Sequence, residues 1–147
     1  MKIAIGSDHA GYKVKENLIK ALSSGHSVKD CGAPGEEEPS DYPDIAEKVG
    51  KLVAAGKAER GILVCGTGIG MSIAANKVKG VRAAICRTRE DARLSREHND
   101  ANVLCLGARI VSPELIIEIA KAWLSADFSG GKHEARVEKI KKLEEKA

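Results

Sequence analysis

Cys65 lies near the middle of the chain and is followed by Gly66, Gly68 and Gly70. Because glycine has no Cβ, these residues let the backbone turn sharply and let its N–H groups approach a ligand closely. Such N–H groups, together with the positive end of a following helix, favour a negative charge. A thiol beside them is expected to lose its proton more readily than a free cysteine does. We therefore predict that Cys65 is a base or a nucleophile that faces an anion-binding loop.

A buried core position is the competing interpretation, because cysteine is among the residues most often found in protein interiors. That interpretation fits Cys86 and Cys105, which lie in or near other apolar runs. A core position does not require alternating glycines, so the functional interpretation of Cys65 is favoured. It requires that the sulfur is open to the site and that the neighbouring amides face it.

Three better-known loops do not fit this spacing. A P-loop ends in Gly-Lys-Ser or Gly-Lys-Thr, whereas Gly70 is followed by Met71 and Ser72. The dinucleotide-binding pattern Gly-x-Gly-x-x-Gly, started at Gly66, would need glycine in place of Met71. A cysteine phosphatase loop would need an arginine at that position to hold the phosphate. The sequence therefore excludes these three motifs.

The chain has 147 residues, 43% hydrophobic and 31% charged, which suits one globular domain. A net charge of +3 is too small to indicate nucleic acid, and one Trp, one Phe and two Tyr are too few for a base-stacking surface. No apolar segment is long enough to cross a bilayer, and the first apolar run is too short for a signal peptide. The four cysteines form no Cys-x-x-Cys pair, which favours a reduced cytoplasmic setting.

Short apolar runs alternate with amphipathic segments along the chain. Strands nearly free of polar residues suit a parallel sheet covered on both faces. We therefore predict one domain (1–147), a three-layer α/β/α sandwich with a Rossmann-like parallel sheet of about five strands. The predicted strands are 2–5, 27–31, 62–64, 81–86 and 103–106. The first predicted helix follows His9. The other predicted helices are 42–56, 73–77, 89–98, 112–124 and 133–146.

Several polar residues come directly after predicted strands. Asp8 and His9 follow the first strand, Cys65 follows the third and Arg109 follows the fifth. The carboxyl ends of parallel strands lie at one edge of the sheet, where such folds bind ligands. These residues are therefore expected to gather at one rim. The run at 98–100 precedes a strand, so it joins them only if its helix ends near that rim.

The last predicted helix has a narrow apolar stripe of Val137, Ile140 and Leu143 among many charges. A stripe of this width suits packing against a neighbouring subunit. A solvated tail explains the same pattern equally well.

Five motifs occur in chain order: Gly-Ser-Asp-His-Ala-Gly at 6–11, Asp-Tyr-Pro-Asp at 41–44, the Cys-Gly-Thr-Gly loop and its helix at 65–77, Arg-Glu-His-Asn-Asp-Ala-Asn at 96–102, and Gly-Gly-Lys-His through Arg-Val at 130–137. Together they resemble the ribose-5-phosphate isomerase B family. The likeness extends from Met1 to the final helix. The wider group also contains galactose-6-phosphate isomerase subunits and allose-phosphate isomerases.

The resemblance implies an aldose–ketose isomerase of the pentose phosphate pathway, which interconverts ribose 5-phosphate and ribulose 5-phosphate through an enediolate without metal or cofactor. It implies that Cys65 is the base that moves a proton between C1 and C2. It implies that His98 opens the furanose ring by donating a proton, and that Thr67 belongs to the catalytic group. The implied substrate-binding residues are Asp8, His9, Gly66, Thr67, Gly68, Ile69, Gly70, Asn99, Arg109, Lys132 and Arg136.

The resemblance also implies a homodimer, with a dimer of dimers left open. In the family the active site lies between two subunits, and the partner's C-terminal helix holds part of the phosphate. Neither nucleic acid nor a membrane is implied as a partner. Lys132 stands where the family usually carries arginine, and lysine lacks the two-pronged guanidinium that grips a phosphate.

Other functions stay open at this point. Allose 6-phosphate or galactose 6-phosphate is the nearest alternative substrate. A non-catalytic sensor of a phosphorylated ligand would need the glycine loop but no reactive thiol. A metal-assisted isomerase would use Asp8, His9, Cys65 and His98, which have no local ligand spacing.

Structural roles also compete for the polar residues. Asp8 could be a helix cap, and His98 could be a helix C-terminal histidine favoured by the dipole. His26 is expected to be solvated. Arg87, Arg89, Arg93 and Arg96 look like an exposed helix face and are assigned no role.

Overall fold

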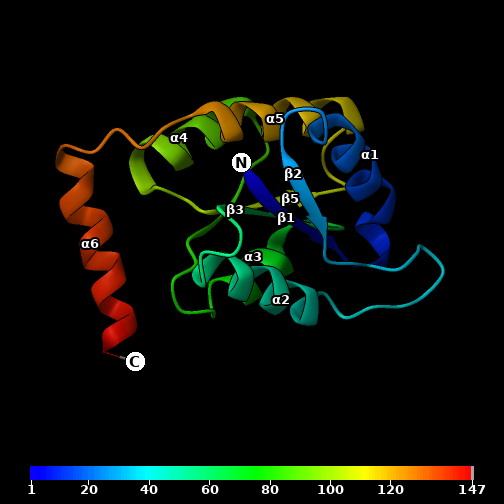
Figure 1. Cartoon of the computed structure of the whole chain (residues 1–147), viewed down its shortest axis with the longest axis horizontal. Coiled ribbons are helices and arrows are strands. Elements are labelled where there is room, and N and C mark those ends of the chain that lie inside the picture. Colours follow the sequence, from blue (N-terminus) through cyan, green and yellow to red (C-terminus); the bar gives the residue numbers. More distant parts are fainter. Residues whose placement is uncertain (147) are drawn as a thin grey trace.

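The apolar runs form the strands of a parallel five-stranded sheet in the computed structural model, which describes residues 1–146 (Figure 1). The strand order is β2-β1-β3-β5-β4, so the strand that carries Cys65 lies in the middle. Buried Val, Ile and Leu dominate β1, β3 and β5, as expected for strands covered on both faces. The strands are β1 (Lys2–Ser7), β2 (Ser27–Asp30), β3 (Arg60–Cys65), β4 (Ala83–Ile85) and β5 (Val103–Gly107).

Helices cover both faces of this sheet (Figure 1). One layer contains α1 (Tyr12–Leu22), α4 (Arg89–Asn99) and α5 (Pro113–Ser125), and the other contains α2 (Tyr42–Ala54) and α3 (Ile69–Ala75). Successive side chains of a strand point to opposite faces. Ile3 and Ile5 therefore pack into the first core, and Ala4 packs into the second. The predicted three-layer α/β/α architecture is confirmed.

The bounds of β4 and α3 (Ile69–Ala75) differ from the prediction for physical reasons. The strand expected at 81–86 is only β4, because the Arg82 N–H donates to Oδ1 of Asn102 at 2.8 Å instead of to a neighbouring strand. Along its outer edge, the side-chain amide of Asn76 pairs with both backbone groups of Ala83. These side-chain bonds close the edge of the sheet. The helix expected at 73–77 begins earlier, at Ile69.

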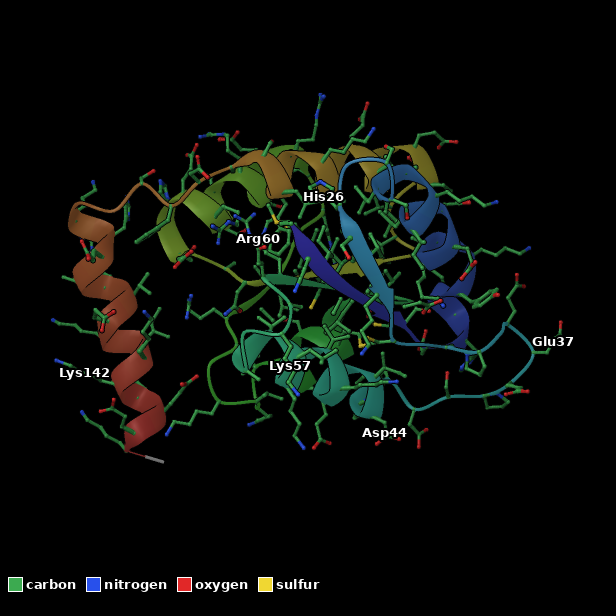
Figure 2. All side chains as sticks on the ribbon, in the orientation of Figure 1. His26, Glu37, Asp44, Lys57, Arg60 and Lys142 are labelled. Atoms are coloured by element: carbon green, nitrogen blue, oxygen red, sulfur yellow. The ribbon has the colours of Figure 1, made fainter. Side chains whose placement is uncertain are left out.

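The last helix, α6 (Lys132–Glu145), stands at one end of the molecule beside the end of α4 (Figure 1). In Figure 2, Lys142 on α6 and Glu37 in the loop after β2 lie at opposite ends of the long axis. Val137 is buried, whereas Ile140 is 42% exposed and Leu143 is 63% exposed. The helix therefore leaves most of its apolar stripe uncovered by its own chain.

Candidate active site

Three loops meet at the carboxyl end of the sheet. Cys65 and Gly107 are register partners in β3 and β5, so both strands end at the same level. The Arg109 N–H donates to the carbonyl of Gly66 at 2.9 Å, and the Asp8 N–H donates to the carbonyl of Val64 at 3.2 Å. The predicted gathering of these strand ends at one rim is confirmed. We call this set of residues (8–9, 65–70 and 107–109) the cysteine rim.

The sulfur of Cys65 receives a backbone hydrogen bond. The Gly68 N–H donates to Sγ at 3.1 Å, and Gly68 can turn its amide this way because its φ is +81°, in the left-handed region. Such a bond is stronger when the sulfur is an anion. The residue is buried, with 5% of its surface exposed. The requirement that a neighbouring amide faces the sulfur is therefore met.

Cys86 and Cys105 lie deeper in the core than Cys65, which also packs into the second core. Cys105 is fully enclosed and Cys86 is 1% exposed. Burial raises the pKa of Cys86 to about 11, and burial raises the pKa of Cys105 further, with additions from nearby Cys65 and Cys86. Both thiols are therefore protonated and inert at neutral pH, and their predicted role in the core is confirmed.

The glycines bring other groups close to the loop. A Cβ on Gly66 would lie 3.3 Å from a guanidinium nitrogen of Arg109, and a Cβ on Gly70 would lie 2.6 Å from the ring of Tyr42. Gly70 lies in the first turn of α3 and is therefore not part of an open loop. Its lack of a side chain leaves room for the Tyr42 ring. Tyr42 is thus a neighbour of the site that sequence analysis missed.

Thr67 and Ile69 complete the cysteine rim. The Thr67 hydroxyl accepts the Ile69 N–H at 3.2 Å, which orders the start of α3. The Thr67 carbonyl packs so closely on Gly107 that a Cβ there would lie 2.6 Å away. Ile69 itself is 48% exposed.

Asp8 and His9 lie at the end of β1. The Asp8 side chain is nearly buried and accepts the Gly11 N–H at 3.1 Å, so the competing interpretation of Asp8 as a helix cap is correct for this carboxylate. The Ser40 N–H donates to Nδ1 of His9 at 3.3 Å. A neutral His9 must then carry its proton on Nε2, which is free to donate to a ligand. Nothing in the sequence pointed to Ser40.

His98 and Asn99 lie at the opposite end of the sheet. Helix α4 runs back along the strands after β4 and ends just before β5 begins, so its last turn lies at the amino end of β5. From Val103 to Gly107, β5 spans about 13 Å. Within one chain, the structure therefore does not bring His98 to Cys65.

The basic residues of α6 share this second location. Lys132 and Arg136 are exposed in the first turns of α6. The His98 ring stacks on the ring of His133, with centroids 4.2 Å apart and planes at 14°. We call the set 98–99, 132–133 and 136 the histidine rim.

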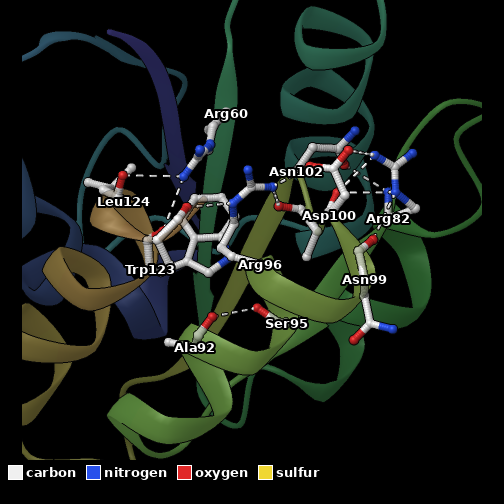
Figure 3. A network of polar contacts seen from close by, with 12 residues as sticks. Arg60, Arg82, Ala92, Ser95, Arg96, Asn99, Asp100, Asn102, Trp123 and Leu124 are labelled. Carbon is white, nitrogen blue, oxygen red and sulfur yellow. Dashed lines mark hydrogen bonds and ion pairs between the residues drawn. The ribbon is translucent and has the colours of Figure 1, made fainter. Parts of the chain in front are cut away.

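A polar network holds the end of α4 in place (Figure 3). Asp100, in the left-handed region with φ +47°, accepts from Arg96 at 2.8 Å and from Arg82 at 3.4 Å. Arg82 also donates to the main-chain carbonyl of Asn99 at 3.2 Å, while the Asn99 side chain extends away from the network (Figure 3). Arg96 is 6% exposed, so its predicted place on an exposed face is wrong: it forms the base of the histidine rim.

Two kinds of feature are absent from residues 1–146. No group of three or more His, Cys, Asp or Glu residues in this part of the chain could hold a metal ion. None of its helices combines the length and the apolar character that crossing a membrane requires.

Comparison with known proteins identifies the family of this chain. The sequence profile of the ribose/galactose isomerase family matches residues 3–140. The chain belongs to this family. Ribose-5-phosphate isomerase B of Escherichia coli (strain K12) is 47% identical over 146 residues, which covers 99% of this chain and 97% of that protein.

Two solved structures of this family share the fold closely. Ribose-5-phosphate isomerase B of Clostridium thermocellum has a TM-score of 0.97 and 52% identity, with 99% of each chain covered. The enzyme of Mycoplasma genitalium, solved with ribulose 5-phosphate bound, has a TM-score of 0.95 and 40% identity, with 99% of this chain and 97% of that chain covered. The ribose-5-phosphate isomerase B resemblance is therefore confirmed along the whole chain.

Proposed function

We propose that this chain interconverts ribose 5-phosphate and ribulose 5-phosphate. The observation that carries this proposal is the amide N–H of Gly68 aimed at the sulfur of Cys65, in a chain similar over its whole length to ribose-5-phosphate isomerases. A six-carbon sugar phosphate and a non-catalytic sensor are not favoured, because the full-length relatives described above are five-carbon sugar phosphate isomerases.

Cys65 moves the proton between the two reacting carbons. Its thiolate takes the proton from C2 of the open aldose, and the electrons of that bond form the C1=C2 double bond while the carbonyl oxygen becomes an enediolate anion. The thiol then returns the proton to C1 as the O2 proton passes to O1. General-base help of this kind contributes about 10²–10⁴-fold to rate.

The cysteine rim stabilises the anion of the intermediate. Backbone N–H groups and Thr67 line the loop beside the sulfur, and Arg109 lies over Gly66. One preorganised donor of this kind typically lowers the barrier by about 3–4 kcal/mol. The near enclosure of Cys65 strengthens these interactions because little water competes for them.

His98 opens the sugar ring. It donates a proton to the ring oxygen while the C1–O bond to that oxygen breaks and the C1 hydroxyl proton leaves to solvent. Asn99, next to it, is free to bind a sugar hydroxyl because its side chain points away from the Asp100 network (Figure 3). Lys132 and Arg136 hold the phosphate, whose binding energy positions C1 and C2 against Cys65.

Two subunits are needed for one complete site. The cysteine rim and the histidine rim of one chain are separated by about the length of β5. Both rims carry residues of the implied active site. The separation therefore supports a homodimer in which the cysteine rim of one subunit faces the histidine rim of the other.

The surface of α6 supports the same assembly. A groove of about 670 Å³ lies between α6 and the segment around β4, lined in part by Val81, Ile140 and Leu143. Ile73 of α3, three residues before the groove-lining Asn76, is 61% exposed. Exposed apolar patches of this kind mark binding surfaces, and a second copy of the chain is the partner that would complete the site.

Solvent exchange tests the proposed reaction. In D₂O, the parent protein should place deuterium on C1 of ribulose 5-phosphate, and Cys65→Ala should lower this exchange by about 10³-fold or more. The matched control Cys86→Ala removes a thiol that the mechanism does not use and should keep the exchange rate. Proton NMR of the sugar measures it. A Cys65→Ala protein that exchanges at the parent rate would remove Cys65 from the mechanism.

The cell compartment follows from the proposed role. A pentose phosphate isomerase works on metabolites of the cytoplasm, and we place this chain there. Its four cysteines are free thiols, in keeping with a reducing compartment.

A further inference from the structure

His133 lies flat against the proposed ring-opening acid. The imidazoles of His98 and His133 belong to the same chain and stack at 4.2 Å, nearly parallel. His98 is in the last turn of α4, and His133 is the second residue of α6. The isomerisation described above gives His133 no task.

Main-chain hydrogen bonds anchor the two helix ends that carry these rings. The Ser129 N–H donates to the carbonyl of Glu97 at 3.0 Å, directly beside His98. The His133 N–H donates to the carbonyl of Gly130 at 3.1 Å, which closes the turn into α6. The segment before α6 is therefore fastened to the end of α4, and the stack is a built contact between two anchored helix ends.

The two rings lie at opposite poles of their helices. His98 is at the negative end of the α4 dipole, which favours a cation, and His133 is at the positive end of α6, which disfavours one. Partial burial, then the positive charges of His98, Lys132 and Arg136, lower the pKa of His133. The lowered pKa of His133 favours its neutral form, so the ring stacked on His98 carries no charge at neutral pH.

The other charged groups around the stack are mostly engaged elsewhere. On α4, Glu97 pairs with Arg93, and Arg96 pairs with Asp100. On α6, Glu134 is the acidic residue of the first turn and is exposed, so water screens it. The charges that act on His133 are therefore those of His98, Lys132 and Arg136.

We propose that His133 is a positioning residue for His98: the stack fixes the plane of the His98 ring, and the flat second imidazole, being neutral, does not repel the protonated form of His98 that opens the ring. This inference rests on the role proposed above for His98.

Two assays separate ring opening from proton transfer. Ribose 5-phosphate is mostly a closed furanose, so its turnover includes ring opening. Ribulose 5-phosphate cannot close a furanose because its O5 carries the phosphate, so exchange of its C1 proton in D₂O omits that step. A residue that serves only His98 should affect the first assay and spare the second.

Three variants at position 133 test the inference. His133→Ala should lower kcat for ribose 5-phosphate about tenfold and change KM less, whereas His133→Phe, which keeps a flat neutral ring, should lose about threefold. His133→Lys places a cation on the stack, so the loss of kcat with rising pH should begin about one pH unit lower than in the parent. C1 exchange of ribulose 5-phosphate should stay within about twofold in the Ala and Phe variants. His26→Ala, a histidine far from the stack, is the matched control.

The outcomes separate the inference from the function on which it rests. The inference is overturned if His133→Ala keeps the parent kcat while His98→Ala is impaired, or if His133→Lys leaves the pH profile unmoved. Equal losses in both assays would also overturn it, because His133 would then act beyond ring opening. If His98→Ala itself turns over ribose 5-phosphate at the parent rate, the proposed role of His98 fails first.

Discussion

The cysteine rim and the histidine rim are formed by different kinds of structure. At the cysteine rim, the strand ends and their hydrogen bonds set the geometry: the Gly68 N–H bonds Sγ of Cys65, and the Arg109 N–H bonds the Gly66 carbonyl. At the histidine rim, helix ends carry the side chains, and a polar network around Asp100 holds the end of α4. The cysteine rim is therefore typical of a preformed anion-binding site. The histidine rim carries the side chains proposed to donate a proton and to bind the phosphate.

This difference suggests how the catalytic work is divided. Backbone amides fixed by a sheet cannot move far, which suits stabilisation of a short-lived enediolate. The exposed side chains of Lys132 and Arg136 on α6 are free to change rotamer, which suits capture of a flexible sugar phosphate. Under the function proposed above, each rim is incomplete by itself, so activity should depend on the assembly of two subunits.

The largest effect that separates the rims is expected at His98. His98→Ala should lower ribose 5-phosphate turnover by about 10²-fold because the general acid is lost. C1 exchange of ribulose 5-phosphate should persist, since that step belongs to the cysteine rim. Steady-state kinetics and NMR exchange measure the two quantities. Loss of both in parallel would mean that the rims do not divide the steps as proposed.

A smaller effect is expected at the base of the histidine rim. Asp100→Asn keeps a side chain that tolerates the left-handed backbone but leaves Arg96 buried without its counter-ion, so stability should fall by about 2–4 kcal/mol. Urea unfolding measures the free energy. Glu138→Gln, which removes an exposed ion pair of α6, should cost less than about 1 kcal/mol. Equal losses in the two variants would show that the network does not anchor α4.

The smallest effect is expected at Lys132. Lys132→Arg introduces the two-pronged guanidinium usual in the family, so KM for ribose 5-phosphate should fall about two- to fivefold with little change in kcat. Lys139→Arg, in an exposed position further along α6, is the matched control. If KM stays constant in Lys132→Arg, position 132 does not contact the phosphate.

The cysteine rim could be predicted from the sequence because its geometry is local. Parallel strands place the residues that follow them at one edge, so the positions of Asp8, Cys65 and Arg109 followed from the strand pattern alone. The start of α3 was missed because glycine has weak helix propensity, and the long-range contact of Gly70 with Tyr42 overrides it. Such a contact joins residues that no short window of sequence contains.

The histidine rim was harder to place. A helix that connects two parallel strands must return to the amino end of the sheet, so its last residues could have been assigned to the opposite rim from topology. The burial of Arg96 had a weak signal as well, because Asp100 follows it by four residues. The stack of His98 on His133 had none, since it depends on how α6 docks.

Mixing two inactive variants tests the central claim most directly. Cys65→Ala subunits lack a working cysteine rim and His98→Ala subunits lack a working histidine rim, so a mixed dimer regains one intact site of two. After subunit exchange at equal concentrations, about a quarter of the parent turnover of ribose 5-phosphate should appear, because about half of the dimers are mixed. Native mass spectrometry counts the mixed dimers. Mixed dimers that form but turn over no faster than the two separate variants would contradict a site shared between subunits.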